Sequence, residues 1–170
     1  MEGRGKAGSR GDADKMSAIE QFADSEVFRA YATYVAVVLL KMMLMSLCTA
    51  YYRITLGVFA NPEDALGHAK GGDVKKFVRR DESVERVRRC HLNDIENIVP
   101  FVGLGLLYVL SNPELSTALL HFRIFAGSRI AHTISYLAPL PQPGRALSFF
   151  AGFFVNCSMG YAILSSISYF

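Results

Sequence analysis

Four apolar segments separated by polar connections organise the chain. They cover residues 27–52, 83–110, 116–137 and 146–170, and the last holds no Asp, Glu, Lys or Arg. A helix needs about 20 apolar residues to cross a bilayer. The segment 83–110 is polar over its first half, so it spans only if that half lies at the headgroups or inside the bundle. The pattern predicts an all-α membrane protein with an antiparallel four-transmembrane-helix bundle.

Composition supports a membrane protein in which charges are segregated. Hydrophobic residues make up 51% of the chain and charged residues 19%, which is too apolar for an ordinary soluble domain of this size. Residues 1–15 are rich in Gly and charge, so we predict a disordered tail over residues 1–24 and the membrane domain over residues 25–170. Cys48, Cys90 and Cys157 have no paired spacing, and no metal site is expected.

The connections indicate the orientation of the bundle. The connection 53–89 contains the basic run Lys75, Lys76, Arg79 and Arg80, which the positive-inside rule assigns to the cytosol. The short connection 111–113 holds no Lys or Arg and should lie on the opposite side. The Pro-rich stretch 139–144 then ends the third helix on the cytosolic side. The basic run lacks interleaved aromatic residues, so we expect it to face headgroups rather than nucleic acid.

Candidate chemistry lies on two helix faces. Arg89, Asn93 and Glu96 fall at i, i+4 and i+7 and share a face. Arg129, His132 and Tyr136 do the same at i, i+3 and i+7, and Arg145 opens the last segment. Cations inside a bundle require a counter-anion. Spacing leaves two interpretations open: a small anionic ligand, or internal pairing such as Glu96 with Arg129.

Lys41 lies alone near the middle of the first segment. A lysine at this depth is costly in lipid. Its position favours a charge that is satisfied by another helix or that reaches the headgroup region, and a ligand role is the alternative.

Several of these stretches resemble one known family. The chain is similar to the MAPEG family of membrane proteins in eicosanoid and glutathione metabolism, through Phe59-Ala60-Asn61-Pro62-Glu63-Asp64, Val84-Glu85-Arg86-Val87-Arg88-Arg89 and His91-Leu92-Asn93-Asp94-Ile95-Glu96-Asn97. The stretches Lys41-Met42-Met43-Leu44-Met45-Ser46 and Arg145-Ala146-Leu147-Ser148-Phe149-Phe150 resemble its glutathione transferases. The resemblance covers residues 16–170.

The resemblance implies an activity and an assembly. It implies a homotrimer in the endoplasmic reticulum membrane and mitochondrial outer membrane, with glutathione between neighbouring subunits near the cytosol. Glutathione would be the co-substrate, conjugated to lipophilic electrophiles, and the same thiolate would reduce lipid hydroperoxides. The acceptor would enter from membrane lipid, between the first and fourth helices.

The resemblance also implies the site residues. A free thiol has a pKa of about 8.5 and reacts as the thiolate, which a guanidinium stabilises. Arg145 is the expected catalytic residue, assisted by Tyr136, and Glu96 would bind the amino group of glutathione. The full glutathione-binding set is Arg53, Arg88, Arg89, His91, Asn93, Glu96, Arg129, His132, Tyr136 and Arg145.

Other functions remain open within the family. An eicosanoid synthase of the prostaglandin E or leukotriene C type is one, and a non-catalytic lipid-binding scaffold is another. The prostaglandin type carries Ser directly after the corresponding arginine and Tyr three residues further on, whereas this chain has Ala146 and Phe149. Mammalian glutathione transferases of the family carry a reactive Cys where this chain has Ala65, which argues against activation by thiol modification at that position.

Overall fold

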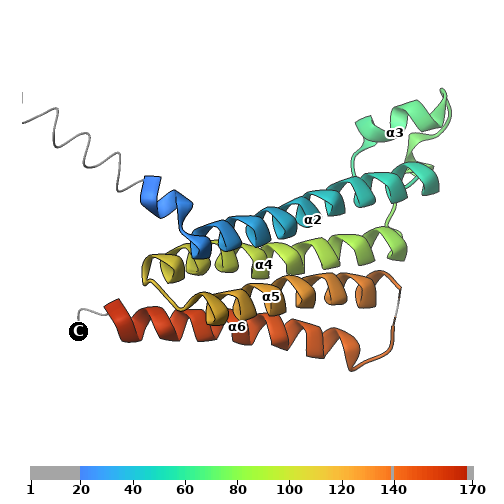
Figure 1. Ribbon diagram of the computed structural model, residues 1–170. Helices are drawn as coiled ribbons and strands as arrows, with labels where there is room; N and C mark the ends of the chain where they lie inside the picture. The colour runs from blue at the N-terminus through green and yellow to red at the C-terminus, as the bar shows by residue number, and fades with distance from the viewer. Residues whose placement is uncertain (1–19, 139, 168–170) are drawn as a thin grey trace, which may run out of the picture.

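The computed structural model describes residues 20–138 and 140–167. Four long helices lie side by side and alternate in direction (Figure 1). They are α2 (Glu26–Leu56), α4 (Glu82–Leu110), α5 (Leu115–Leu137) and α6 (Gly144–Ile167). In the described residues the only β-type pairing is one isolated bridge between Phe59 and Val78. The predicted all-α class is confirmed, and the helix bounds lie within a few residues of those expected.

The four helices are arranged around a central pair. Helices α4 and α5 contact each other, and each contacts both α2 and α6. Within the described residues, α2 and α6 make no contact with each other. The start of α2 and the end of α6 lie at one end of the molecule, whereas the α2–α4 and α5–α6 connections lie at the other (Figure 1).

The connection between α2 and α4 contains structure that the hydrophobic pattern does not predict. It forms helix α3 (Pro62–Ala69) and the short 3₁₀ helix η1 (Val74–Lys76). Pro62 occupies the first turn of α3, where its missing N–H costs nothing, and Glu63 and Asp64 follow at the positive end of the helix dipole. These residues mark a helix start within a stretch that the sequence predicts only as a polar connection.

Residues 20–24, just before α2, are helical. Phe22 packs against the core, with its ring centroid 4.8 Å from that of Phe28. Helical structure that packs on the bundle is therefore present before residue 25, because an aromatic side chain gains more from burial than from solvation. Residues 1–19 of the expected tail lie outside the described residues.

Local signals fix the ends of the long helices. Ser25 precedes α2, and its Oγ accepts a hydrogen bond from the Phe28 N–H at 3.2 Å. Gly57 ends α2 in the left-handed conformation, at φ 60°. Asp81 caps α4 by accepting from the Ser83 N–H at 2.9 Å.

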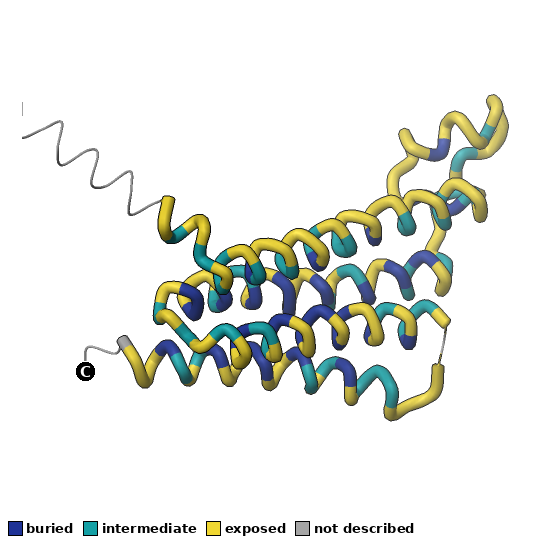
Figure 2. Tube along the Cα trace, viewed as in Figure 1, coloured by how far each residue is buried: buried dark blue, intermediate teal, exposed yellow. Residues whose placement is uncertain are grey.

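Three of the described helices are long and apolar enough to cross a membrane: α2, α4 and Gly144–Ser166 of α6. Helix α5, which carries Arg123 and Arg129, is not among them. Exposed positions run along the outside of all four long helices (Figure 2). Large apolar side chains are among them, including Leu40, Leu44 and Leu47 of α2, each at least 60% exposed. An outward apolar surface of this extent is compatible with lipid rather than water, so the chain is a membrane protein.

Aromatic side chains build the core. The rings of Phe101 and Phe125 stack between α4 and α5, with centroids 3.9 Å apart. Tyr31 of α2 packs on Phe122 and donates its hydroxyl hydrogen to the Val102 carbonyl at 2.7 Å. A small residue, Gly105, lets α4 approach this ring.

We expect Gly105→Ala to destabilise the protein. A Cβ at Gly105 would lie 2.7 Å from a Tyr31 ring carbon, and the ring is held by its hydrogen bond and by Phe122. Overpacking of this kind costs about 1–3 kcal/mol, so the thermal unfolding midpoint in detergent should fall. Gly127→Ala is the control, because nothing lies within 4 Å of its Cβ position. Equal midpoints for the two variants would contradict the close approach of α4 to the Tyr31 ring.

Candidate functional site

A cluster of buried charges joins three helices at the middle of the bundle. Arg129 of α5 and Asp94 of α4 have no exposed side-chain surface, and Arg129 Nη2 lies 2.9 Å from Asp94 Oδ1. The other carboxylate oxygen, Oδ2, forms an ion pair with Nζ of Lys41 from α2. The carboxylate therefore bridges two cations. Lys41 is paired with a carboxylate on another helix, which agrees with the first of the two interpretations of its position.

Arg129 is held by further partners through the same nitrogen. Its Nη2 donates to Asn93 Oδ1 at 2.8 Å and lies 3.2 Å from His132 Nδ1. Because a guanidinium group can only donate, the lone pair of Nδ1 faces Arg129, and the ring proton of neutral His132 belongs on Nε2. Nε and Nη1 of Arg129 are buried and have no hydrogen-bond partner among the described residues.

Tyr136 and Arg145 continue this cluster toward the end of the bundle that carries α3. The ring centroids of His132 and Tyr136 are 5.5 Å apart. The guanidinium carbon of Arg145 lies 5.1 Å from the centroid of the Tyr136 ring, at cation–π distance. Nε of Arg145 is also buried, and it too has no hydrogen-bond partner in the part of the chain that the structure describes. The interior thus offers unpaired N–H donors at two arginines.

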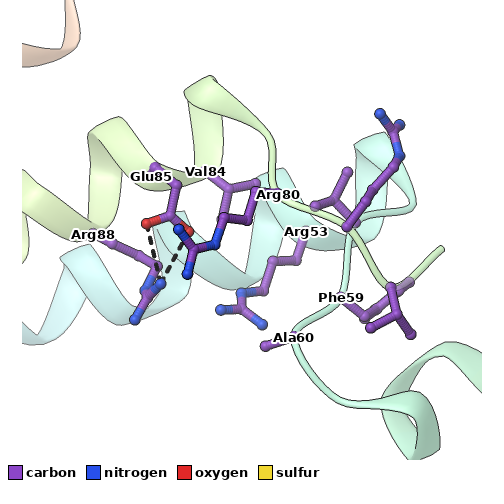
Figure 3. A pocket seen from close by; sticks show the side chains of 10 residues that line it. Arg53, Phe59, Ala60, Arg80, Val84, Glu85 and Arg88 are labelled. Atoms are coloured by element: carbon purple, nitrogen blue, oxygen red, sulfur yellow. Dashed lines mark hydrogen bonds and ion pairs between the residues drawn. The ribbon is translucent and has the colours of Figure 1, made fainter. Parts of the chain in front are cut away.

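Two open cavities lie outside this interior cluster, on the face where α2 meets α4. One has a volume of about 340 Å³ and is lined by Arg53, Arg79, Arg80 and Arg88, with Glu85 as its carboxylate. Figure 3 shows Arg53 from α2 and Arg88 from α4 beside this cavity, with Arg88 hydrogen-bonded to Glu85. The second, about 440 Å³, shares Arg53 and Arg88 and adds His91. Cations outnumber carboxylates around both, which suits an anionic ligand.

The structure places eight of the ten predicted site residues in two groups. It brings together Asn93, Arg129, His132, Tyr136 and Arg145 through successive contacts in the interior. Arg53, Arg88 and His91 line the outer cavities instead. Arg89 is half exposed and pairs with Glu82. Glu96 is exposed, and one subunit by itself does not gather all ten residues into a single pocket.

The suggested internal pair of Glu96 with Arg129 is wrong. Arg129 pairs with Asp94, because Asp94 lies on the side of α4 that packs against α5, whereas Glu96 faces outward. Sequence reasoning therefore missed Asp94. The sequence did contain a clue to this residue. Lys41 required a carboxylate at a similar depth in the bundle, and Asp94 and Lys41 lie at about the same distance from the end that carries α3.

The described residues were also compared with the requirements of a metal site. Within residues 20–138 and 140–167, no group of three or more His, Cys, Asp or Glu side chains is placed to hold a metal ion. The site is instead a set of guanidinium, amide, imidazole and phenol groups, which are binding groups for an anionic organic ligand.

Comparison with known proteins identifies relatives that match most of the chain. The family model described as "MAPEG family" matches residues 31–165. The chain is 61% identical to microsomal glutathione S-transferase 1 of Mus musculus, covering 91% of this chain and 99% of that protein. It is 60% identical to the Homo sapiens protein of the same name, covering 89% and 97%.

A second type of relative is more distant. The chain is 36% identical to prostaglandin E synthase of Homo sapiens, covering 82% of this chain and 90% of that protein. The family match extends over most of the chain and covers α4, α5 and most of α2 and α6. Together with the helical architecture and the buried polar cluster, these matches show that the chain belongs to the MAPEG family.

Proposed function

We propose that this protein is a membrane-bound glutathione transferase that conjugates the thiolate of glutathione to lipophilic electrophiles. The observation that carries this proposal is the identity of about 60% to microsomal glutathione S-transferase 1 over nearly the whole length of those relatives. The cation-rich interior supports it, because a tripeptide anion with an ionised sulfur would supply the missing negative charge.

Arg145 is the proposed catalytic residue. Its Nε is buried without a hydrogen-bond partner among the described residues, so the group has capacity for an anionic acceptor. A guanidinium beside the sulfur lowers the free energy of the thiolate relative to the thiol and never supplies a proton itself. Tyr136 lies against Arg145, and its hydroxyl would donate a second hydrogen bond to the sulfur.

The remaining residues would bind the peptide. Glu96 is the proposed partner of the amino group, and the other predicted residues would hold the two carboxylates through charge-assisted hydrogen bonds. Arg53, Arg88 and His91 lie on the outer face of α2 and α4, apart from the interior group. We propose that a ligand contacting both groups lies between subunits of a homotrimer, the functional unit that the family resemblance implies.

The outer face of α4 supports such an assembly. Leu92, Ile95 and Val99 lie along this face and are 41–57% exposed, beside the cavity that Arg88 and His91 line. Because α2 and α6 do not touch in the described part of one chain, an acceptor route between the first and fourth helices would run between subunits. We place the protein in the endoplasmic reticulum and mitochondrial outer membranes, with the basic connection and the site on the cytosolic side.

Hydroperoxide reduction is a second proposed activity of the same site. The thiolate would attack the terminal oxygen of a lipid hydroperoxide, and the O–O bond would break to release the alcohol after protonation. A second glutathione then reduces the sulfenic adduct to give the disulfide and water. This chemistry needs the same ionised sulfur, so it is expected to depend on Arg145 as conjugation does.

Replacing Arg145 should remove most of the conjugation activity. We expect Arg145→Ala to lower kcat with chlorodinitrobenzene roughly 100-fold or more, the usual cost of losing one preorganised donor, and Arg145→Lys to recover part of it. Glutathione binding, measured by equilibrium dialysis in detergent, should weaken much less. Arg123→Ala is the matched control, since Arg123 is exposed and contacts Tyr34 away from this site. Unchanged kcat in Arg145→Ala would remove Arg145 from the mechanism.

Single cysteines can test whether α5 completes a fourth span. We would place Glu63→Cys in α3, Glu114→Cys before α5 and Pro141→Cys after it, all at exposed positions. In sealed microsomes, an impermeant maleimide should label Cys at 63 and 141, and should label Cys at 114 only after permeabilisation. The unsubstituted chain reports any labelling of its native cysteines. Labelling of position 141 together with 114 would show that α5 does not cross.

The assembly can be measured directly. Native mass spectrometry of the detergent-solubilised protein should give a protein mass close to three times the 18.8 kDa of one chain. Light scattering with correction for bound detergent provides an independent value. A protein that remains monomeric while it still conjugates glutathione would rule out a site shared between subunits.

A further inference from the structure

The interior cluster carries a surplus of positive charge. Lys41 and Arg129 are both ion-paired to Asp94, and neutral His132 adds no charge. Among the described residues, the ion pairs other than these two involve exposed or partly exposed side chains of the α4 start. One carboxylate thus serves two cations, and the cluster has a net charge of +1.

The surplus is matched by unused donors. Arg129 has five N–H groups, and the three on Nε and Nη1 have no partner within residues 20–138 and 140–167 although the side chain is wholly buried. Leaving buried donors unpaired is unfavourable. These partnerless N–H groups of a buried cation therefore attract a carboxylate, and a glutathione transferase has one available in its co-substrate.

Asp94 determines how Arg129 presents these donors. Its two carboxylate oxygens are ion-paired with Arg129 and Lys41, and a carboxylate does not bind the carboxylate of a ligand, so its effect on a ligand would act through Arg129. Arg129 Nη2 donates to Asp94 Oδ1 at 2.9 Å and to Asn93 Oδ1 at 2.8 Å. Both acceptors belong to α4, so this nitrogen is held against α4. Lys41 occupies the second carboxylate oxygen, which keeps Asp94 from rotating away from Arg129.

From this geometry we propose that Asp94, secured by Lys41, is a positioning residue that orients Arg129 so that its unpaired N–H groups bind a carboxylate of glutathione. This inference rests on the proposed function. The alternative is that Asp94 only neutralises Lys41, with no effect on the ligand. The two roles separate when the charge balance is kept and the ion pair with Arg129 is removed.

The double variant Lys41→Met/Asp94→Asn does this. It removes one positive and one negative charge, so the cluster keeps its net charge of +1, while Arg129 loses its ionic partner. Lys41→Met is the matched control, because it leaves the pair of Asp94 with Arg129 in place. Wild type and both variants would be purified in detergent, and the KM for glutathione, kcat at saturating glutathione and the thermal unfolding midpoint would be measured for each.

We expect the double variant to raise the KM for glutathione roughly tenfold or more, the scale of losing a hydrogen bond to a charged group. Its kcat at saturating glutathione should change less than about threefold, since Arg145 still stabilises the thiolate. Lys41→Met should raise KM by less. This division between KM and kcat is not expected from loss of folded protein, which lowers the apparent kcat and leaves KM unchanged.

Two results would overturn the assignment. A double variant with the KM of wild type would show that Asp94 only balances Lys41. A double variant that cannot be recovered folded, while Lys41→Met can, would make Asp94 a requirement of the fold rather than a positioning residue. If wild-type protein itself failed to bind glutathione, the proposed function would fail instead, so the two failures are distinguishable.

Discussion

The burial of Arg129 is the constraint on which the rest of the interior depends. A guanidinium group cannot lose its proton, so its charge must be balanced wherever the helices place it. Asp94 and Asn93 of α4 provide the balance and the hydrogen bonds, and Lys41 brings α2 to the same carboxylate. Breaking a buried pair of this kind typically costs roughly 3–5 kcal/mol. Three helices are thereby held in register by one carboxylate.

The same constraint connects the fold to the proposed chemistry. Contacts from Arg129 through His132 and Tyr136 reach Arg145 at the start of α6. The apolar core of Phe101, Phe122 and Phe125 lies deeper in the bundle. Polar groups are thus concentrated toward the end of the bundle that carries the basic connection. In the proposed function, a water-soluble peptide would meet an acceptor dissolved in lipid there.

Local sequence signals predicted the ends of the long helices, but they did not predict helix α3 or the low average hydropathy of α5. Ser25, Gly57 and Asp81 mark helix ends that spacing and composition predicted closely. Helix α3 was missed, because its eight residues are too few to show a hydrophobic period. Helix α5 has the expected bounds, yet its charged and histidine residues keep it out of the set of helices that are apolar enough to span. Arg129 and His132 of α5 are nevertheless buried, and Arg129 pairs with Asp94 of α4, so average hydropathy understates how well α5 fits the bundle.

The sequence alone determined the helical class, the apolar segments and the residues that share a face, because these depend on spacing along one chain. It also supplied the family resemblance and hence the candidate site. Only the tertiary structure decided which carboxylate meets Arg129. Residues 94 and 96 differ by about 200° around a helix, so one faces α5 and the other faces outward. Which residue faces α5 depends on how α4 is rotated about its axis relative to its neighbours. The packing of whole helices determines this rotation, and a local sequence pattern does not predict it.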